Sequence, residues 1–477
     1  MRISQTNDLT TGTPVRVLSI YAIPMLISMF FQQAYNLVDG WVAGNYIGKI
    51  ALGAIGTCYP VTVFLIAISS GLSLGASIFC SQAYGAKKYA DVKSAVSTSI
   101  IVYVPLAVVI GMIGAALSAQ IVVWLDVPEE ARQATIAYLR VYMAGFPFQF
   151  LYNLSNGVLT GLGNSKTPLI FLILSSVCNI ALDYAFVAAM GFGVIGLALA
   201  TILSQMLSAV LALGVVIKVG KQMQASALRF SKEIMKAVIK LGVPSMIQHM
   251  LMSLGQLSLQ SVINGYGLVV MAGYSVAFRL NGLVINSLMA LSNALSGFIA
   301  QNKGAGKEER IKQGIHASLF ISYLFSACVV LILQIWGAEL LGLFIRDAED
   351  TSEVIAAGMG FVRVVSPFYL LVCLKIVFDG ALRGVGAMTA FMVATMSDVV
   401  VRIFCGNPFS DRWGLNGVWA VWPTAWLVGT TLSVGMYCTR TALGGENEDL
   451  PGGRRATATQ EEKTVIIERY RGQLNCL

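Results

Sequence analysis

In the first half of this chain, two carboxylates interrupt apolar stretches. Asp39 lies in QQAYNLVDGWVAGNYI, residues 32–47, and Asp183 lies in an apolar segment that starts near residue 166. A carboxylate in hydrocarbon costs about 3 kcal/mol or more, so each acid needs a reason to be there. Two such groups close together cannot both stay ionised, so one takes up a proton or a cation lies between them. The chemistry predicted for the pair is reversible binding of H⁺ or Na⁺.

The segments around the acids are those of an all-α polytopic membrane protein. Of the 477 residues, 56% are hydrophobic and only 12% are charged, whereas a soluble domain carries about 25% charge. Apolar segments of about 20 residues, enough to cross a bilayer, recur along the chain. We predict twelve transmembrane helices, at 15–43, 52–80, 94–118, 133–158, 166–188, 194–217, 236–262, 270–300, 314–337, 354–382, 387–407 and 415–438.

Other polar residues fall at the depth of the acids. At a rise of about 1.5 Å per residue, Asp39 and Asp183 lie late in outward spans, and Asn179 lies one turn below Asp183. Thr201 and Tyr138 lie within the first two turns of spans that enter from outside. Asp39, Asn179, Asp183 and Thr201 offer the oxygen ligands that Na⁺ prefers. Interhelical hydrogen bonds, worth about 0.6 kcal/mol each, are the structural alternative, which suits a lone Asn or Thr better than two acids.

Basic residues orient the bundle. They crowd alternate connections, such as those at 87–93, 218–240 and 303–312, while the connections at 126–130 and 339–353 are acidic. The positive-inside rule places the basic connections and both termini in the cytoplasm. The net charge of +8 therefore reflects topology, and no soluble basic domain exists to bind nucleic acid. We expect a multi-pass protein of a bacterial or archaeal cytoplasmic (inner) membrane.

An internal repeat divides the chain in two. Similar sequences recur at 219 to 223 residues: Ala22–Pro24 and Gly242–Pro244, Ser81–Val92 and Ala300–Ile311, and NGVLTGLG (156–163) and DGALRGVG (379–386). Two six-helix lobes that both start inside are related by a pseudo-two-fold axis along the membrane normal, and such halves usually enclose a cavity of alternating access. The predicted domains are an N-lobe at 1–217, a cytoplasmic linker at 218–235, a C-lobe at 236–440 and a cytoplasmic tail at 441–477.

The motifs resemble those of the MATE (multidrug and toxic compound extrusion) family, most of all its DinF-like branch. The resemblance covers all twelve spans and is carried by Gln32, YNLVDGWVAG (35–44), Tyr138, Asn153-x-x-Asn156-Gly157, Asn179-x-x-x-Asp183, Thr201 and the GALRGVG loop of the second half. It implies a secondary active antiporter that exports amphipathic, often cationic compounds in exchange for H⁺ or Na⁺.

The resemblance also implies roles for single residues. Ion coupling is associated with the positions of Asp39, Asn179, Asp183 and Thr201, with Tyr138 beside them. Gln32, Asn153 and Asn156 match positions that line the N-lobe cavity. Asp379 is the repeat mate of Asn156, so we expect it to face the cavity and attract a cationic substrate.

Other functions fit the sequence less well. A lipid or lipid-linked oligosaccharide flippase of the same superfamily is the closest alternative. Such flippases resemble proteins with extra spans or more basic cavities, whereas this chain has twelve predicted spans and paired acids. A membrane enzyme needs a nucleophile, metal cluster or cofactor motif. The eight cysteines include no CxxC spacing, and there are two histidines. We expect no cofactor besides the coupling ion, and a monomer whose partners are the bilayer and small-molecule substrates.

Overall fold

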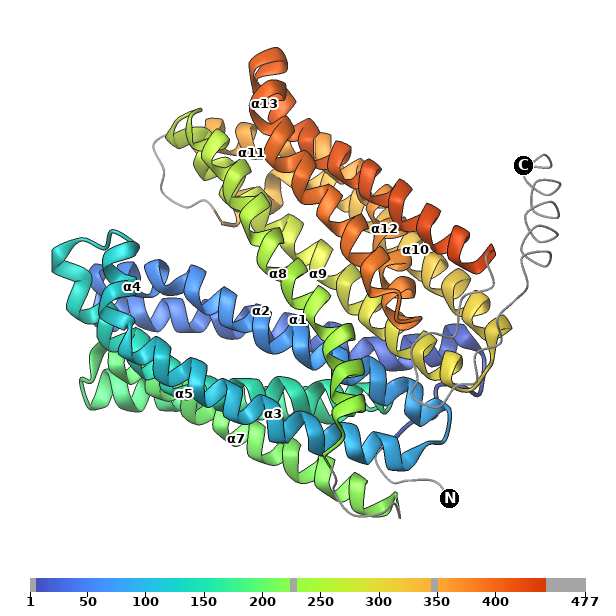
Figure 1. Cartoon of the computed structure of the whole chain (residues 1–477). Coiled ribbons are helices and arrows are strands. Elements are labelled where there is room, and N and C mark those ends of the chain that lie inside the picture. The colour runs from blue at the N-terminus through green and yellow to red at the C-terminus, as the bar shows by residue number, and fades with distance from the viewer. Residues whose placement is uncertain (1–5, 224–229, 345–350, 443–477) are drawn as a thin grey trace. The chain divides into compact units, whose positions relative to one another are not determined.

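The structure, a computed structural model, describes residues 6–223, 230–344 and 351–442, and within these ranges the chain forms helices and no strands (Figure 1). The predicted tail lies outside the described residues from 443 onward, and so do residues 224–229 of the predicted linker. The first part of the chain forms α1 (Pro14–Val42), the π-helical turn η1 (Ala43–Ile47), α2 (Lys49–Gly85), α3 (Tyr89–Ala116), α4 (Ser118–Trp124), α5 (Glu129–Gly161), α6 (Lys166–Asp183), the π-helical turn η2 (Tyr184–Ala189) and α7 (Gly193–Gln222). The second part forms α8 (Lys232–Asn264), α9 (Leu268–Gly304), α10 (Glu308–Gly342), α11 (Thr351–Val365), the 3₁₀ turn η3 (Ser366–Phe368), α12 (Tyr369–Gly384) and α13 (Met388–Ala442).

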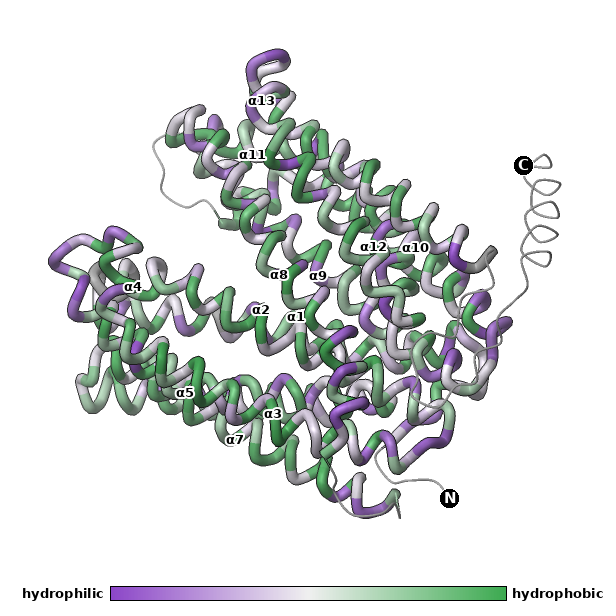
Figure 2. Tube along the Cα trace, in the orientation of Figure 1, coloured by the Kyte–Doolittle hydropathy of each residue, from purple (hydrophilic) through white to green (hydrophobic). Residues whose placement is uncertain are grey.

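Ten helical segments in the described ranges are long and apolar enough to cross a membrane. One of them lies in α13, whose 55 residues would extend about 80 Å, more than twice the hydrocarbon thickness. Gly414, at φ 57° and ψ −143°, breaks α13 into two spans. The helix α5, with 33 residues, is also long enough to cross a membrane but is more polar than the ten. The described residues therefore hold twelve spans, which confirms the predicted number. Figure 2 shows hydrophobic residues along the helices and hydrophilic ones gathered at their ends and turns.

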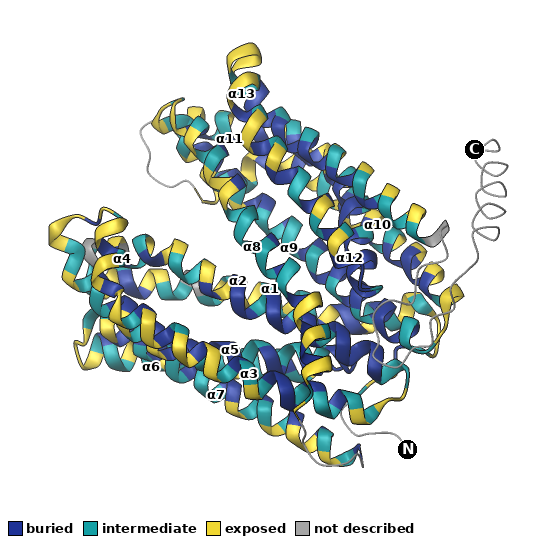
Figure 3. Ribbon diagram, in the orientation of Figure 1, coloured by how far each residue is buried: buried dark blue, intermediate teal, exposed yellow. Residues whose placement is uncertain are grey.

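The chain divides into two compact units. The first consists of residues 1–250 with 297–311, and the second of residues 251–296 with 312–477. In the first unit α5 packs against α2, α3 and α7, while α1 packs against α6. Figure 3 marks buried residues where helices of a unit meet and exposed residues on their outer faces. Many exposed side chains are large and apolar, for example Ile113, Val177 and Phe404, as expected where the surrounding solvent is lipid.

Glycines set the same close helix packing in both halves of the repeat. A Cβ atom added at Gly157 of α5 would lie 2.9 Å from the carbonyl oxygen of Ser73 on α2. A Cβ atom added at Gly380 of α12 would lie 2.7 Å from the carbonyl oxygen of Ser292 on α9. These contacts join positions that correspond in the internal repeat, so the duplication seen in the sequence is confirmed in the packing.

We expect Gly161→Ala to destabilise the protein by about 1–3 kcal/mol, the range for overpacking. Its Cβ atom would lie 2.6 Å from the carbonyl oxygen of Ser77, a backbone atom that cannot move alone. Gly214→Ala is the matched control, because nothing lies within 4 Å of its added Cβ atom and alanine favours a helix by up to about 1 kcal/mol. Thermal unfolding in one detergent measures both, and equal melting temperatures would contradict the packing argument.

A candidate ion site in the first unit

The two acids predicted to act together lie on neighbouring helices that change their winding beside them. Asp39 belongs to the last turn of α1 and Asp183 is the last residue of α6, and these helices pack against each other. The π-helical turn η1 begins four residues after Asp39, and η2 begins directly after Asp183. Short π-helical turns occur often at functional sites, because they re-aim side chains within an otherwise regular helix.

Asn179 joins the two acids. With its amide nitrogen turned toward them, Asn179 donates hydrogen bonds to Asp39 Oδ1 at 2.9 Å and to Asp183 Oδ2 at 3.1 Å. This orientation follows from the hydrogen-bond network, since the amide oxygen would face only acceptors. Asn179 and Asp183 are fully buried. The sequence-predicted trio Asp39, Asn179 and Asp183 is thus brought into direct contact.

The carboxyl groups of Asp39 and Asp183 lie close together, because both accept from the same Asn179 NH₂ group. Two ionised carboxylates repel, so a hydrogen bond between them requires a proton on one of the four oxygens. Asp183 Oδ1 is buried and has no hydrogen-bond partner among the residues described. A buried oxygen without a partner is costly and marks a position where a proton, an ion or a water is expected.

No cation in the described part of the chain pairs with Asp39 or Asp183. In the same residues, no group of three or more His, Cys, Asp and Glu side chains is arranged to hold a metal ion. The buried acids of the second unit differ, because Asp379 pairs with Lys375 and Asp398 pairs with Arg402. Among the described residues, Asp39 and Asp183 thus differ from Asp379 and Asp398 in having no basic partner.

Tyrosines and a threonine surround the acids. Tyr35, one turn before Asp39 on α1, lies beside that acid and donates to Thr201 Oγ1 on α7 at 3.5 Å. Tyr138 of α5 is buried near both acids, and its ring stacks on that of Tyr142 at 6.1 Å between centroids. All five residues predicted for ion coupling thus lie around one site.

Sequence reasoning gave no role to Tyr35 and did not single out Tyr142 or Gln149. Tyr35 links Asp39 to Thr201, and Tyr142 donates to Gln149 Oε1 at 3.4 Å. The spacing of four residues between Tyr35 and Asp39 was an available signal, since residues one turn apart share a helix face. Tyr142 has the same spacing from Tyr138.

The residues predicted to contact substrate in the first unit lie along α1 and α5. Gln32 is exposed, two turns before Asp39. Asn153 is half-buried and donates to Ser69 Oγ at 3.2 Å and to a backbone carbonyl at 3.0 Å. Asn156, also half-buried, lies one turn further along α5. Their role in substrate binding stays a prediction.

Asp379, the fourth predicted substrate contact, belongs to α12 in the second unit. Its Oδ2 atom accepts from Lys375 Nζ at 2.7 Å, and its Oδ1 atom accepts from Ser433 Oγ at 2.5 Å. Both members of the ion pair are buried. Asp379 therefore carries a neutralised charge in this state, and its binding of a cationic substrate stays a prediction.

Comparison with known proteins gives one family. A sequence model of the MatE family matches residues 24–185 and 244–406, one segment in each half of the chain. The matched segments begin 220 residues apart, in agreement with the spacing of the internal repeat.

The relatives are bacterial proteins of similar length. The chain is 29% identical over 434 residues to the probable multidrug resistance protein YoeA of Bacillus subtilis, which covers 88% of this chain and 93% of the relative. It is 25% identical over 405 residues to the multidrug export protein MepA of Staphylococcus saprophyticus, covering 84% and 88%.

Solved structures share the fold. One shows the outward-facing conformation of a multidrug resistance MATE family transporter, with a TM-score of 0.84, 24% identity and coverage of 91% of this chain and 97% of that one. Another is a MOP superfamily transporter from Pyrococcus furiosus, with a TM-score of 0.83, 23% identity and the same coverage. At this identity the likeness establishes the architecture alone.

Proposed function

This chain belongs to the MatE family of membrane transporters, which are not enzymes, and from that premise we propose that it is a multidrug efflux antiporter driven by protons. It exports amphipathic, often cationic compounds and takes up H⁺ in exchange by alternating access. Relatives named for multidrug resistance and multidrug export support the substrate class. The names of these relatives give no coupling ion, so we infer the ion from the residues of the site.

The observation that carries the proposal is the pair Asp39 and Asp183, which are joined by Asn179 and have no counter-cation among the described residues. A buried pair of acids that share a proton is stable with that proton and repulsive without it. Proton release therefore changes the forces between α1 and α6. Gly40 lies directly after Asp39 and has open space around it, so α1 is able to bend there in response.

Asp39 and Asp183 lie close enough to share a proton, and on that ground we propose H⁺ as the coupling ion. The hydrogen-bond assignment turns the Asn179 NH₂ group toward both acids. A Na⁺ site built from Asp39, Asn179, Asp183 and Thr201 needs the Asn179 oxygen to face the acids instead. A proton shared by the two carboxyl groups needs no such change, because one acid donates it to the other and the remaining oxygens still accept from the Asn179 NH₂ group.

We place the transporter in a bacterial or archaeal cytoplasmic membrane with both termini in the cytoplasm. The basic connections support this orientation. The protein works as a monomer whose partners are the bilayer and its substrates, and H⁺ is its only exchangeable ion.

Transport in proteoliposomes tests the proposal. The full chain is reconstituted, and accumulation of a fluorescent cationic dye is followed under an imposed pH gradient, a Na⁺ gradient or neither. We expect uptake with the pH gradient and none with Na⁺ alone. Transport driven only by Na⁺ would overturn proton coupling. Translocation of labelled lipid without dye transport would favour the flippase.

A further inference from the structure

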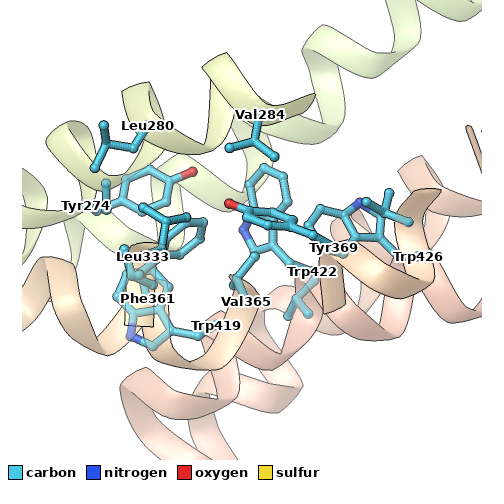
Figure 4. Packing of buried hydrophobic residues seen from close by; sticks show 14 of the residues in the cluster. Tyr274, Leu280, Val284, Leu333, Phe361, Val365, Tyr369, Trp419, Trp422 and Trp426 are labelled. Carbon is cyan, nitrogen blue, oxygen red and sulfur yellow. The ribbon is translucent and has the colours of Figure 1, made fainter. Parts of the chain in front are cut away.

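The second unit contains a cluster of large aromatic side chains (Figure 4). Trp419, Trp422 and Trp426 lie on one face of α13 at spacings of three and four residues, and all are at most 3% exposed. The ring of Tyr274 stacks on Trp419 with 5.5 Å between centroids, and the ring of Phe361 lies edge-on to Trp422 at 5.8 Å. A cluster of electron-rich ring faces is the usual environment for recognition of an organic cation.

A cation of the chain already lies on this cluster. The Arg402 guanidinium carbon is 4.0 Å from the centroid of the Trp422 ring. Arg402 also pairs with Asp398 one turn earlier, through Nε to Oδ1 and Nη2 to Oδ2, both at 3.4 Å. Arg402 and Asp398 are at most 4% exposed. An aromatic face and a carboxylate thus hold one positive charge between them.

The hydrogen bonds that Arg402 makes to Asp398 are long. Charge-assisted hydrogen bonds are usually about 2.7–2.9 Å long, and both Arg402 contacts to Asp398 are 3.4 Å. Arg402 Nη1 and Trp422 Nε1 are buried donors that have no acceptor in the part of the chain that the structure describes. By contrast, the Lys375–Asp379 pair is 2.7 Å long. The residues around Trp422 therefore leave the hydrogen-bonding capacity of the Arg402 guanidinium partly unused.

We propose that Trp422 and Asp398 form an organic-cation subsite in the second unit, and that Arg402 occupies it as a built-in competitor. The proposal rests on the proposed function and names a binding site for it. Its ligand is a planar or quaternary cation that presents delocalised charge to the Trp422 face and is neutralised by Asp398. Substrate binding displaces the guanidinium, which the long arginine side chain allows by rotation about its own bonds.

Equilibrium binding of radiolabelled tetraphenylphosphonium to the detergent-solubilised full chain tests the subsite without any ion gradient. We expect Arg402→Met to tighten binding about ten-fold, the equivalent of one cation–π contact freed for the ligand. Trp422→Leu in the wild-type background should weaken binding by a similar factor. The double variant R402M/D398N should lose the gain of R402M, because the carboxylate is gone.

A second Arg–Trp pair supplies the matched controls. Arg412 lies 5.5 Å over the ring of Trp413 on the same helix, but both residues are exposed. Arg412→Met and Trp413→Leu should leave binding unchanged, so a gain in R412M would reveal a general effect of removing positive charge and overturn the subsite.

Binding and transport by the wild-type chain distinguish a failure of the subsite proposal from a failure of the proposed function. A wild-type chain that binds and transports the cation, with no change in W422L and R402M, would overturn the subsite alone. A wild-type chain that neither binds nor transports any cation would overturn the proposed function. If R402M does not fold, W422L against W413L decides the question.

Discussion

Asp39→Asn is expected to abolish coupling between the pH gradient and efflux. Asparagine has nearly the shape of a protonated aspartic acid but cannot release a proton, so α1 and α6 remain in the proton-bound arrangement. The pH gradient should then no longer raise the efflux rate above the rate seen without a gradient, because the coupling free energy between proton and substrate is lost. The measurement is dye accumulation in proteoliposomes under an imposed pH gradient.

The pair predicts a pattern among variants. Asp183→Asn should fail like Asp39→Asn, and the double variant should be no worse than either, because both residues share the titrating proton. Asp126→Asn is the control: Asp126 is exposed at φ 51°, a conformation that asparagine adopts readily. Undiminished pH-driven efflux by D39N would refute the coupling site.

The fold was largely predictable from the sequence, because lipid imposes one simple requirement. A span needs about 20 apolar residues with all backbone groups bonded internally, and such segments are visible without a structure. Local changes from α-helical to π-helical or 3₁₀ hydrogen bonding could not be predicted from the sequence. The π-helical turns after Asp39 and Asp183 and the break at Ser366–Phe368 occur inside apolar runs, where hydropathy does not distinguish one winding from another.

The parts of the candidate site that could be predicted are the residues whose placement in a membrane costs much free energy. Asp39 and Asp183 stood out because an acid in hydrocarbon is costly, and helical rise then placed Asn179 beside them. Tyr35 did not stand out, since a tyrosine among apolar residues costs little and is common. The aromatic cluster around Trp422 was missed for the same reason: large rings in an apolar span are typical of packing, and only the Arg402 contact sets them apart.

The Lys375–Asp379 pair makes the sequence prediction for the second unit testable. The spacing of four residues places Lys375 and Asp379 on one face of α12, and their 2.7 Å contact neutralises both charges. Gly429 leaves room for the lysine, since a Cβ atom there would lie 2.5 Å from Lys375 Cε. Ser433 holds the other oxygen of Asp379. The Lys375 side chain is therefore closely packed where it neutralises the Asp379 carboxylate.

Lys375→Met should destabilise the protein by about 3–5 kcal/mol, because it leaves Asp379 buried and uncompensated. The double variant K375M/D379L should recover most of that loss, since apolar replacements of a buried pair are often neutral or better. Thermal unfolding in one detergent measures both. Arg132→Met is the control: Arg132 pairs at 3.3 Å with an exposed Glu129, and surface pairs contribute about 1 kcal/mol or less.

The same double variant separates structure from substrate binding at Asp379. If Asp379 serves only to neutralise Lys375, K375M/D379L is stable and transports cations at the wild-type rate. If Asp379 also attracts the substrate, as its correspondence with Asn156 predicts, the double variant is stable but binds cations more weakly. An equally unstable single and double variant would contradict the ion-pair argument, because the loss would then come from packing around Gly429 and not from an unpaired charge.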